Sequence, residues 1–156
     1  MTPRKKRTQT HKFTHAMQFR IELLDTCPLI WRRVQVPDSY SFWDLHCAIT
    51  DAIGWKDYHL HQFDIKQDGK KKPVSIGIPG EDDKPKRGVM PGWKIPLADY
   101  FSKPDDRARY TNDFGDNWIH GLVFEGSMPV RDGIKYPVCL EGGMAGPPED
   151  CGRVSG

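Results

Sequence analysis

Residues 41–54 read SFWDLHCAITDAIG and carry the clearest structural signal in the chain. Ser41 and Asp44 stand three residues apart, as in a capping box with Asp in place of Glu at the start of a helix. Gly54 stands where a helix that ends in a left-handed residue favours glycine. The apolar residues between them recur at i, i+3, i+4, i+7 and i+8, which predicts a helix with one face toward a core. They are Leu45, Ala48, Ile49, Ala52 and Ile53.

Two alternating stretches precede this helix. In residues 17–24 every second residue is apolar, which is typical of a half-buried strand. Residues 30–36 alternate in the same way, although Arg32 interrupts the inward row and Trp31 interrupts the outward row. Residues 25–28 read DTCP and favour a turn, so the two strands form a hairpin.

The segments after the helix predict fewer regular elements. A strand is expected at residues 59–65, and a second hairpin is expected around the turn-forming sequence FGDN. Residues 67–93 are rich in Gly, Pro, Lys and Asp and predict an irregular insertion with at most one short strand. The expected fold is therefore α+β, in the order ββα-β-loop-ββ, with one mainly antiparallel or mixed sheet of about five strands against the helix. The strands of the second hairpin are expected at residues 107–113 and 118–125. A helical turn is expected at residues 97–101, and the chain from residue 126 is expected to be loop.

Composition narrows the class of protein. With 156 residues, 37% hydrophobic and 28% charged, the chain has the size and balance of one globular domain. No stretch approaches the roughly 20 apolar residues that cross a bilayer, and the basic N-terminus lacks the apolar segment of a secretion signal. We therefore expect a cytoplasmic protein that does not enter a membrane and whose four cysteines are reduced.

The net charge of +2 comes from the N-terminus, because residues 1–15 contain five cations and no acid. We expect residues 1–15 to form a flexible basic arm, residues 16–152 to form one domain, and residues 153–156 to form a short tail. Such an arm can also bind phosphate groups through charge, which leaves a DNA-associated function as an alternative. The cations that would make this contact are Arg4, Lys5, Lys6 and Arg7.

Three motifs resemble a known family. IGW at residues 53–55 with HLHQF at 59–63, NDFGDNWIH at 112–120, and YPVCL at 136–140 with PPEDCG at 147–152 occur in the order found in the Ri-plasmid (pRiA-type) ORF-three-like family. The resemblance covers about residues 16–152. The resemblance implies a protein found on plasmids and mobile elements, but it does not imply an activity. Some members of the family carry a transposon-resolvase label. No helix-turn-helix pattern supports that label.

The chain departs from the family pattern at two positions. Asn112 replaces a usual Tyr, and Gly146 replaces a frequent Cys. Family members also usually continue past the position of Gly152, so this chain is expected to be a short or truncated member.

A metal centre is one interpretation of the polar residues. Histidines on two strands, with late cysteines, offer the nitrogen and sulfur ligands that zinc accepts. The alternative is that the histidines are buried structural residues with hydrogen-bonded nitrogens. No cofactor is expected under that alternative. The candidate ligands are His59, His61, His120, Cys139 and Cys151.

The leading hypothesis is a non-enzymatic binding or adaptor domain for a protein or nucleic-acid partner. Exposed aromatic and acidic residues beside the two histidine-bearing strands would form its surface. The acidic residues also have simpler interpretations. Asp113 and Asp116 lie next to a Phe-Gly sequence that favours a turn, and the carboxylates of Glu149 and Asp150 can cap backbone N–H groups. The surface residues are Trp55, Asp113, Asp116, Trp118, Glu149 and Asp150. A metal-dependent enzyme or zinc-stabilised domain remains the alternative.

Overall fold

The helix expected from residues 41–54 is present as α1 (Phe42–Ile53). The Ser41 side chain accepts a hydrogen bond from the Asp44 N–H, and the Asp44 carboxylate accepts one from the Ser41 N–H, so the predicted capping box is confirmed. Gly54 ends the helix with φ of 91°, the left-handed conformation that glycine adopts at little cost.

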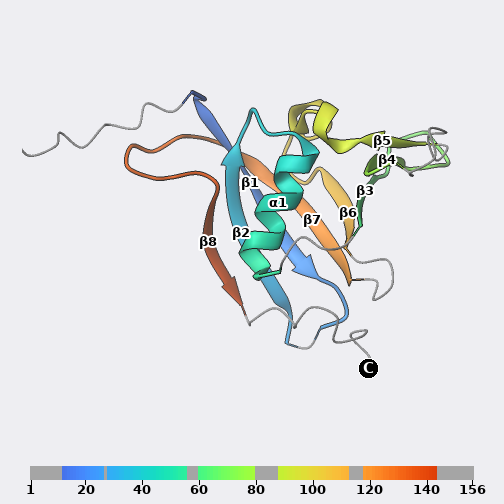
Figure 1. The fold of residues 1–156 in the computed structure, drawn as a ribbon, viewed down its shortest axis with the longest axis horizontal. Helices are drawn as coiled ribbons and strands as arrows, with labels where there is room; N and C mark the ends of the chain where they lie inside the picture. Colours follow the sequence, from blue (N-terminus) through green and yellow to red (C-terminus); the bar gives the residue numbers. More distant parts are fainter. Residues whose placement is uncertain (1–11, 27, 56–59, 80–87, 113–117, 144–156) are drawn as a thin grey trace, which may run out of the picture.

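The computed structural model describes residues 12–26, 28–55, 60–79, 88–112 and 118–143. Within these ranges α1 packs against one mixed sheet of eight strands, which confirms an α+β fold (Figure 1). The other elements, in chain order, are β1 (His15–Leu23), β2 (Ile30–Pro37), β3 (His61–Ile65), β4 (Val74–Gly77), β5 (Val89–Pro91), the short 3-10 helices η1 (Gly92–Lys94) and η2 (Leu97–Asp99), β6 (Arg107–Asn112), β7 (Trp118–Pro129) and β8 (Val138–Gly143).

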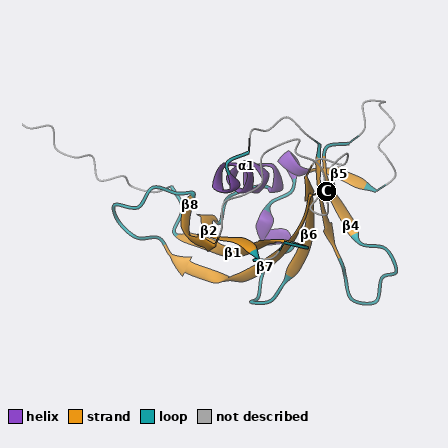
Figure 2. Cartoon of the chain, turned by 90° about the horizontal axis from the view of Figure 1, so that it is seen from below, coloured by secondary structure: helices purple, strands orange, loops and turns teal. Residues whose placement is uncertain are grey.

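The sheet has the strand order β5-β4-β3-β6-β7-β1-β2-β8. Every neighbouring pair is antiparallel except β4 with β5. β1 therefore lies between β2 and β7, although β7 comes much later in the chain. Figure 2 shows the sheet bending, so that β1, β2 and β8 lie under α1 while β4 and β6 stand beside it. The helix consequently occupies the inner side of the bend.

The expectation of about five strands was wrong, because three further strands extend the sheet. β4 and β5 both lie in residues 67–93, where at most one short strand was expected, and β8 lies in the part expected to be loop. β5 has only three residues, and most residues of β8 are exposed, so neither shows the alternation that marks a half-buried strand. Both are strands because their main chains pair with β4 and β2.

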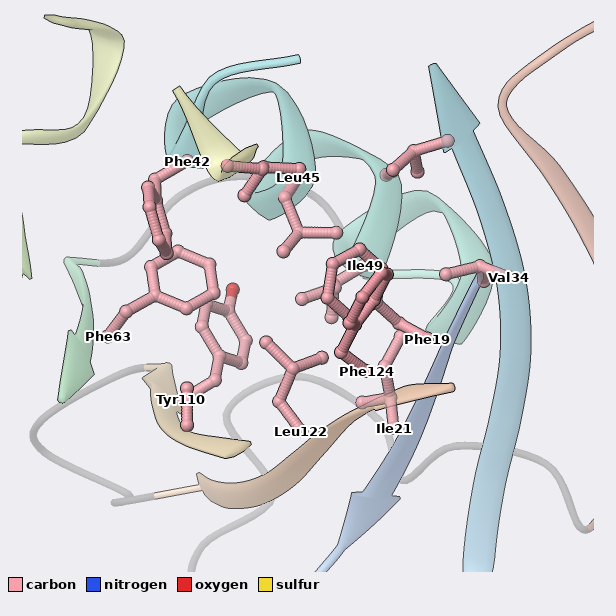
Figure 3. Packing of buried hydrophobic residues seen from close by; sticks show 14 of the residues in the cluster. Phe19, Ile21, Val34, Phe42, Leu45, Ile49, Phe63, Tyr110, Leu122 and Phe124 are labelled. Atoms are coloured by element: carbon pink, nitrogen blue, oxygen red, sulfur yellow. The ribbon is translucent and has the colours of Figure 1, made fainter. Parts of the chain in front are cut away.

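The core lies between α1 and the inner face of the sheet. Figure 3 shows Phe42, Leu45 and Ile49 of the helix pointing toward aromatic and aliphatic residues of the strands. Each of these side chains is completely buried. Full burial of such a residue stabilises the fold by about 1.5–3 kcal/mol relative to an exposed one. The facing strand residues include Phe19, Ile21, Phe63, Tyr110, Leu122 and Phe124.

Arg32, which interrupts the inward row of β2, joins three elements. Its Nε donates to the carbonyl of Ala52 near the end of α1 at 3.1 Å, and its Nη1 donates to the carbonyl of Gly143 in β8 at 3.1 Å. The last turn of α1 has no basic residue of its own. Arg32 therefore supplies the cation that a helix C-terminus favours.

In the described part of the chain, no helix is long and apolar enough to span a membrane.

Candidate functional site

Four polar rings meet between α1 and the inner face of the sheet. They are His46 of α1, His61 of β3, Tyr110 of β6 and His120 of β7, and together they are called the imidazole cluster below. All four residues are buried, with 0–2% of their surface exposed. Tyr110 and His120 are direct cross-strand partners, and the alternation of β3 places His61 on the same inner face. The alternating pattern of the three strands thus positions three of the four rings.

His46 connects the helix to the sheet side of the cluster. Its Nδ1 lies 2.6 Å from the hydroxyl oxygen of Tyr110, which is a short hydrogen bond between buried groups. Its ring also stacks on the ring of His61, with 3.5 Å between centroids and 7° between planes. The helix therefore fixes the positions of both the tyrosine hydroxyl and the second imidazole.

His61 is buried on the inner face of the sheet. Neither its Nδ1 nor its Nε2 has a partner among the described residues. Burial, and to a lesser degree the neighbouring His46, lowers the pKa of His61 from 6.5 to about 3, so the ring is neutral near pH 7. A neutral imidazole carries one donor and one acceptor. Leaving such groups buried and unpaired costs about 1–3 kcal/mol each.

His120 satisfies one of its two nitrogens. Its Nδ1 lies 3.3 Å from the carbonyl oxygen of Tyr110, and a carbonyl only accepts, so the proton of this hydrogen bond belongs to Nδ1. Nε2 is then an acceptor, and no described residue donates to it. Burial lowers the pKa of His120 to about 4, against an opposing effect of the backbone groups of Tyr110 and Trp118.

Three tryptophans surround the cluster. The ring of Trp43 lies 5.4 Å from that of His46 and 5.7 Å from that of His61, measured between centroids. The ring of Trp55 lies 5.5 Å from that of His120 and 6.0 Å from that of Trp118. The Trp118 Nε1 is buried and, among the described residues, has no acceptor. Trp43 is only partly buried, so it borders solvent beside the two stacked imidazoles.

The arrangement suits hydrogen bonding better than metal coordination. Parallel stacked imidazoles direct their in-plane lone pairs side by side, so His46 and His61 do not converge on one ion in this arrangement. Within the ranges that the structure describes, no three His, Cys, Asp or Glu residues gather in a way that could hold a metal. By contrast, His61, Trp118 and His120 together present four buried nitrogens that can each take part in a hydrogen bond.

The structure brings together four of the residues singled out from the sequence: Trp55, His61, Trp118 and His120. The expectation that Trp55 and Trp118 belong to an exposed surface was wrong, because both pack into the core and are only 7% and 4% exposed. It does not bring Cys139 to them. That residue is exposed on β8, which is separated from β7 by β1 and β2, or about 14 Å across the sheet. The other candidates lie outside the described residues. They are His59, Asp113, Asp116, Glu149, Asp150 and Cys151, with Arg4, Lys5, Lys6 and Arg7 of the proposed arm.

Sequence reasoning missed His46 and Tyr110. A signal for His46 exists, because Phe42, His46, Ile49 and Ile53 also recur at helical spacing and all four are buried. For Tyr110 the signal is the alternation of Ala108, Tyr110 and Asn112 in β6, all of which are buried.

Comparisons with known proteins agree with this architecture. A crystal structure of a protein of unknown function, MM3350 from Methanosarcina mazei Go1, matches with a TM-score of 0.80 and 36% identity over 92% of this chain and 77% of its own. The uncharacterised protein y4hQ of Sinorhizobium fredii is 30% identical over 126 residues, or 80% of this chain. The chain spans 60% of the length of y4hQ. Residues 15–156 match the family described as plasmid pRiA4b ORF-3-like protein. The chain therefore belongs to the plasmid pRiA4b ORF-3-like family.

Proposed function

We propose that the chain is a non-enzymatic binding or adaptor domain, and that an uncharged hydrogen-bonding group of its partner is received at the imidazole cluster. The observation that carries this proposal is the set of four buried nitrogens without a hydrogen-bond partner among the described residues. They belong to His61, Trp118 and His120.

Buried polar groups without a hydrogen-bond partner destabilise a fold and are therefore rare. Most buried polar atoms in folded proteins are paired, and each exception costs about 1–3 kcal/mol. A cluster of four such atoms around two imidazoles is therefore an expensive arrangement unless another molecule supplies the missing donors and acceptors.

The protonation state indicates what kind of group fits. Since burial holds the pKa of both His61 and His120 well below 7, neither of these two imidazoles is charged near neutral pH. An uncharged group that both donates and accepts matches two neutral imidazoles and an indole N–H. A peptide or carboxamide group has this chemistry. The site therefore favours an amide group of a protein partner over a negatively charged group.

A peptide-display selection on the full chain tests the proposal. Peptides selected on the wild-type chain should lose about tenfold or more in affinity for His61→Leu and for His120→Leu, because each substitution removes hydrogen-bonding nitrogens from the site. His15→Leu is the matched control, since His15 is exposed at the start of β1. If the selected peptides bind both cluster variants as tightly as the wild type, the cluster is not the binding site.

Zinc is the second candidate, and what favours it is that three ring nitrogens of His61 and His120 have no partner among the described residues. Elemental analysis of the purified chain separates the two candidates. Stoichiometric zinc that is lost in His61→Leu and His120→Leu would establish a metal site in place of a peptide site.

The third candidate, DNA binding through residues 1–15, predicts that deleting these residues lowers DNA affinity, and an unchanged affinity would exclude it.

A further inference from the structure

A groove of about 610 Å³ lies on the outer face of the sheet, the face turned away from α1. It crosses β1, β6 and β7 and is bordered by the end of β3. Its volume falls in the range of about 300–1,000 Å³ in which proteins bind small molecules. His120 borders both the groove and the imidazole cluster, but the other groove residues alternate with the inner-face residues along their strands and so lie on the opposite face, and the groove needs an account of its own.

The groove carries three cations. Lys66, Arg107 and Arg109 line it, and none of them forms a salt bridge among the described residues. Arg107 and Arg109 stand two positions apart on β6 and thus project from the same face of the sheet. Two neighbouring guanidinium groups offer paired donors with the geometry that carboxylates and phosphates accept.

The acidic residues of the groove are already engaged. Glu22 accepts a hydrogen bond from the Nε of Arg20 at 2.6 Å. Asp64 accepts hydrogen bonds from Ser75 at 2.6 Å and from Gln62 at 2.8 Å. Asp64 is the cross-strand neighbour of Arg109, yet these two residues form no salt bridge. The three cations therefore keep their charge available for a ligand.

The floor of the groove is apolar and has room at its centre. Arg109 and Glu22 are the cross-strand partners of Gly121 on its two sides, so the glycine leaves a gap between two charged side chains. Leu24, Pro73 and Val123 complete the lining with apolar surface. A side chain at position 121 would project into this gap.

We propose that this groove binds a small organic anion, in which a phosphate or carboxylate head contacts Arg107, Arg109 and Lys66 while an apolar body covers Gly121 and Val123. A single-stranded nucleic acid fits less well. Cross-strand pairing forms one row of four residues, with a carboxylate at each end: Glu22, Gly121, Arg109 and Asp64. A polyanion that crossed the strands along this row would therefore meet a carboxylate on both sides of the gap.

Isothermal titration of the full chain with four probes tests the proposal. The probes are phenyl phosphate, benzoate, inorganic phosphate and a short oligothymidylate. We expect binding of phenyl phosphate, benzoate or both, which identifies the head group, and weaker binding of inorganic phosphate because it lacks the apolar body. Equal affinity for inorganic phosphate would overturn the role of the apolar floor. An oligothymidylate that binds more tightly than the small anions would overturn the ligand class, and the absence of binding by every probe would overturn the site.

Two variants of different kinds locate the binding. Gly121→Leu fills the gap without changing any charge, and its Cβ would meet Leu24 at 3.6 Å, an ordinary contact, so the fold should tolerate it. The double variant Arg107→Gln with Arg109→Gln removes two of the three cations and keeps side chains of similar length. Each should weaken binding about tenfold or more, as the loss of a charged hydrogen bond does. Arg131→Gln, an exposed arginine beyond the end of β7, is the matched control and should bind as the wild type does. Wild-type affinity in both groove variants would refute the proposal.

Discussion

Lowering the pH from about 8 to about 5 should reduce the free energy of unfolding by about 4 kcal/mol through His61 and His120 alone. Both residues are buried, and burial lowers their pKa from 6.5 to about 3 and about 4. The unfolded chain therefore binds protons below about pH 6.5 that the folded chain does not bind until much lower pH. Stability from these residues is complete above about pH 6.5 and is lost as the pH falls toward 3.

The magnitude follows from the width of this window. In the unfolded chain, pH 5 lies about 1.5 units below the histidine pKa of 6.5, so both histidines are protonated. In the folded chain both remain almost entirely neutral at pH 5. Each unit corresponds to about 1.4 kcal/mol, so each histidine accounts for about 2 kcal/mol. The lowered pKa values of Asp106 and Glu125 contribute mainly below pH 5, because their ordinary values are 3.8 and 4.5. The choice of pH 5 thus isolates the histidines.

Urea denaturation followed by tryptophan fluorescence, at constant ionic strength and at several pH values, measures this dependence. His61→Leu should remove about half of the drop between pH 8 and pH 5, because His120 is still present. His15→Leu, at an exposed position, should leave the drop unchanged. A free energy of unfolding that stays constant to within about 1 kcal/mol over this range, or the full drop in His61→Leu, would refute the assignment of the effect to the imidazole cluster.

Three stability predictions concern the scaffold, each measured by urea denaturation near pH 7. Ser41→Ala should lose about 1 kcal/mol because it removes the N-cap of α1, whereas Ser39→Ala at an exposed turn should change little; equal effects would contradict the capping argument. Ile49→Ala should lose about 2–5 kcal/mol because Ile49 is completely buried in the core; a loss below about 1 kcal/mol would contradict that packing. Gly77→Ala should lose more than the surface-mutation range of about 0.5 kcal/mol, because its Cβ would lie 2.6 Å from the backbone oxygen of His61; a wild-type midpoint would contradict this close approach.

Elements with strong local signals were predicted well from the sequence. Ser41, Asp44 and Gly54 mark the ends of α1 because capping depends on residues within one turn of the chain. The alternation in β1 and β2 predicted their hairpin, which pairs from Ala16 with Pro37 to Leu23 with Ile30. Such patterns are readable because each depends on neighbours in sequence.

Elements whose stability depends on distant partners were not predicted. β8 is an exposed edge strand that exists through pairing with β2, and β5 is a three-residue strand beside β4. In the candidate site, His61 and His120 lie on the buried faces of β3 and β7, as the alternation of apolar residues in these strands indicates. The contact that completes the cluster, between His46 and Tyr110, joins residues 64 positions apart, and no local pattern specifies it.

The position of β1 between β2 and β7 also has a kinetic consequence. On a ribosome, β1, β2 and α1 emerge before β7 and already contain a complete hairpin and the helix that covers it. The other edge of β1 must wait for β7, as shown by Gln18 and Glu125, which hydrogen-bond although they are 107 residues apart. Pairings of such separation are slow to form, because loop closure costs entropy before any contact is gained. Until β7 has emerged, the nascent chain therefore exposes one unpaired edge of β1.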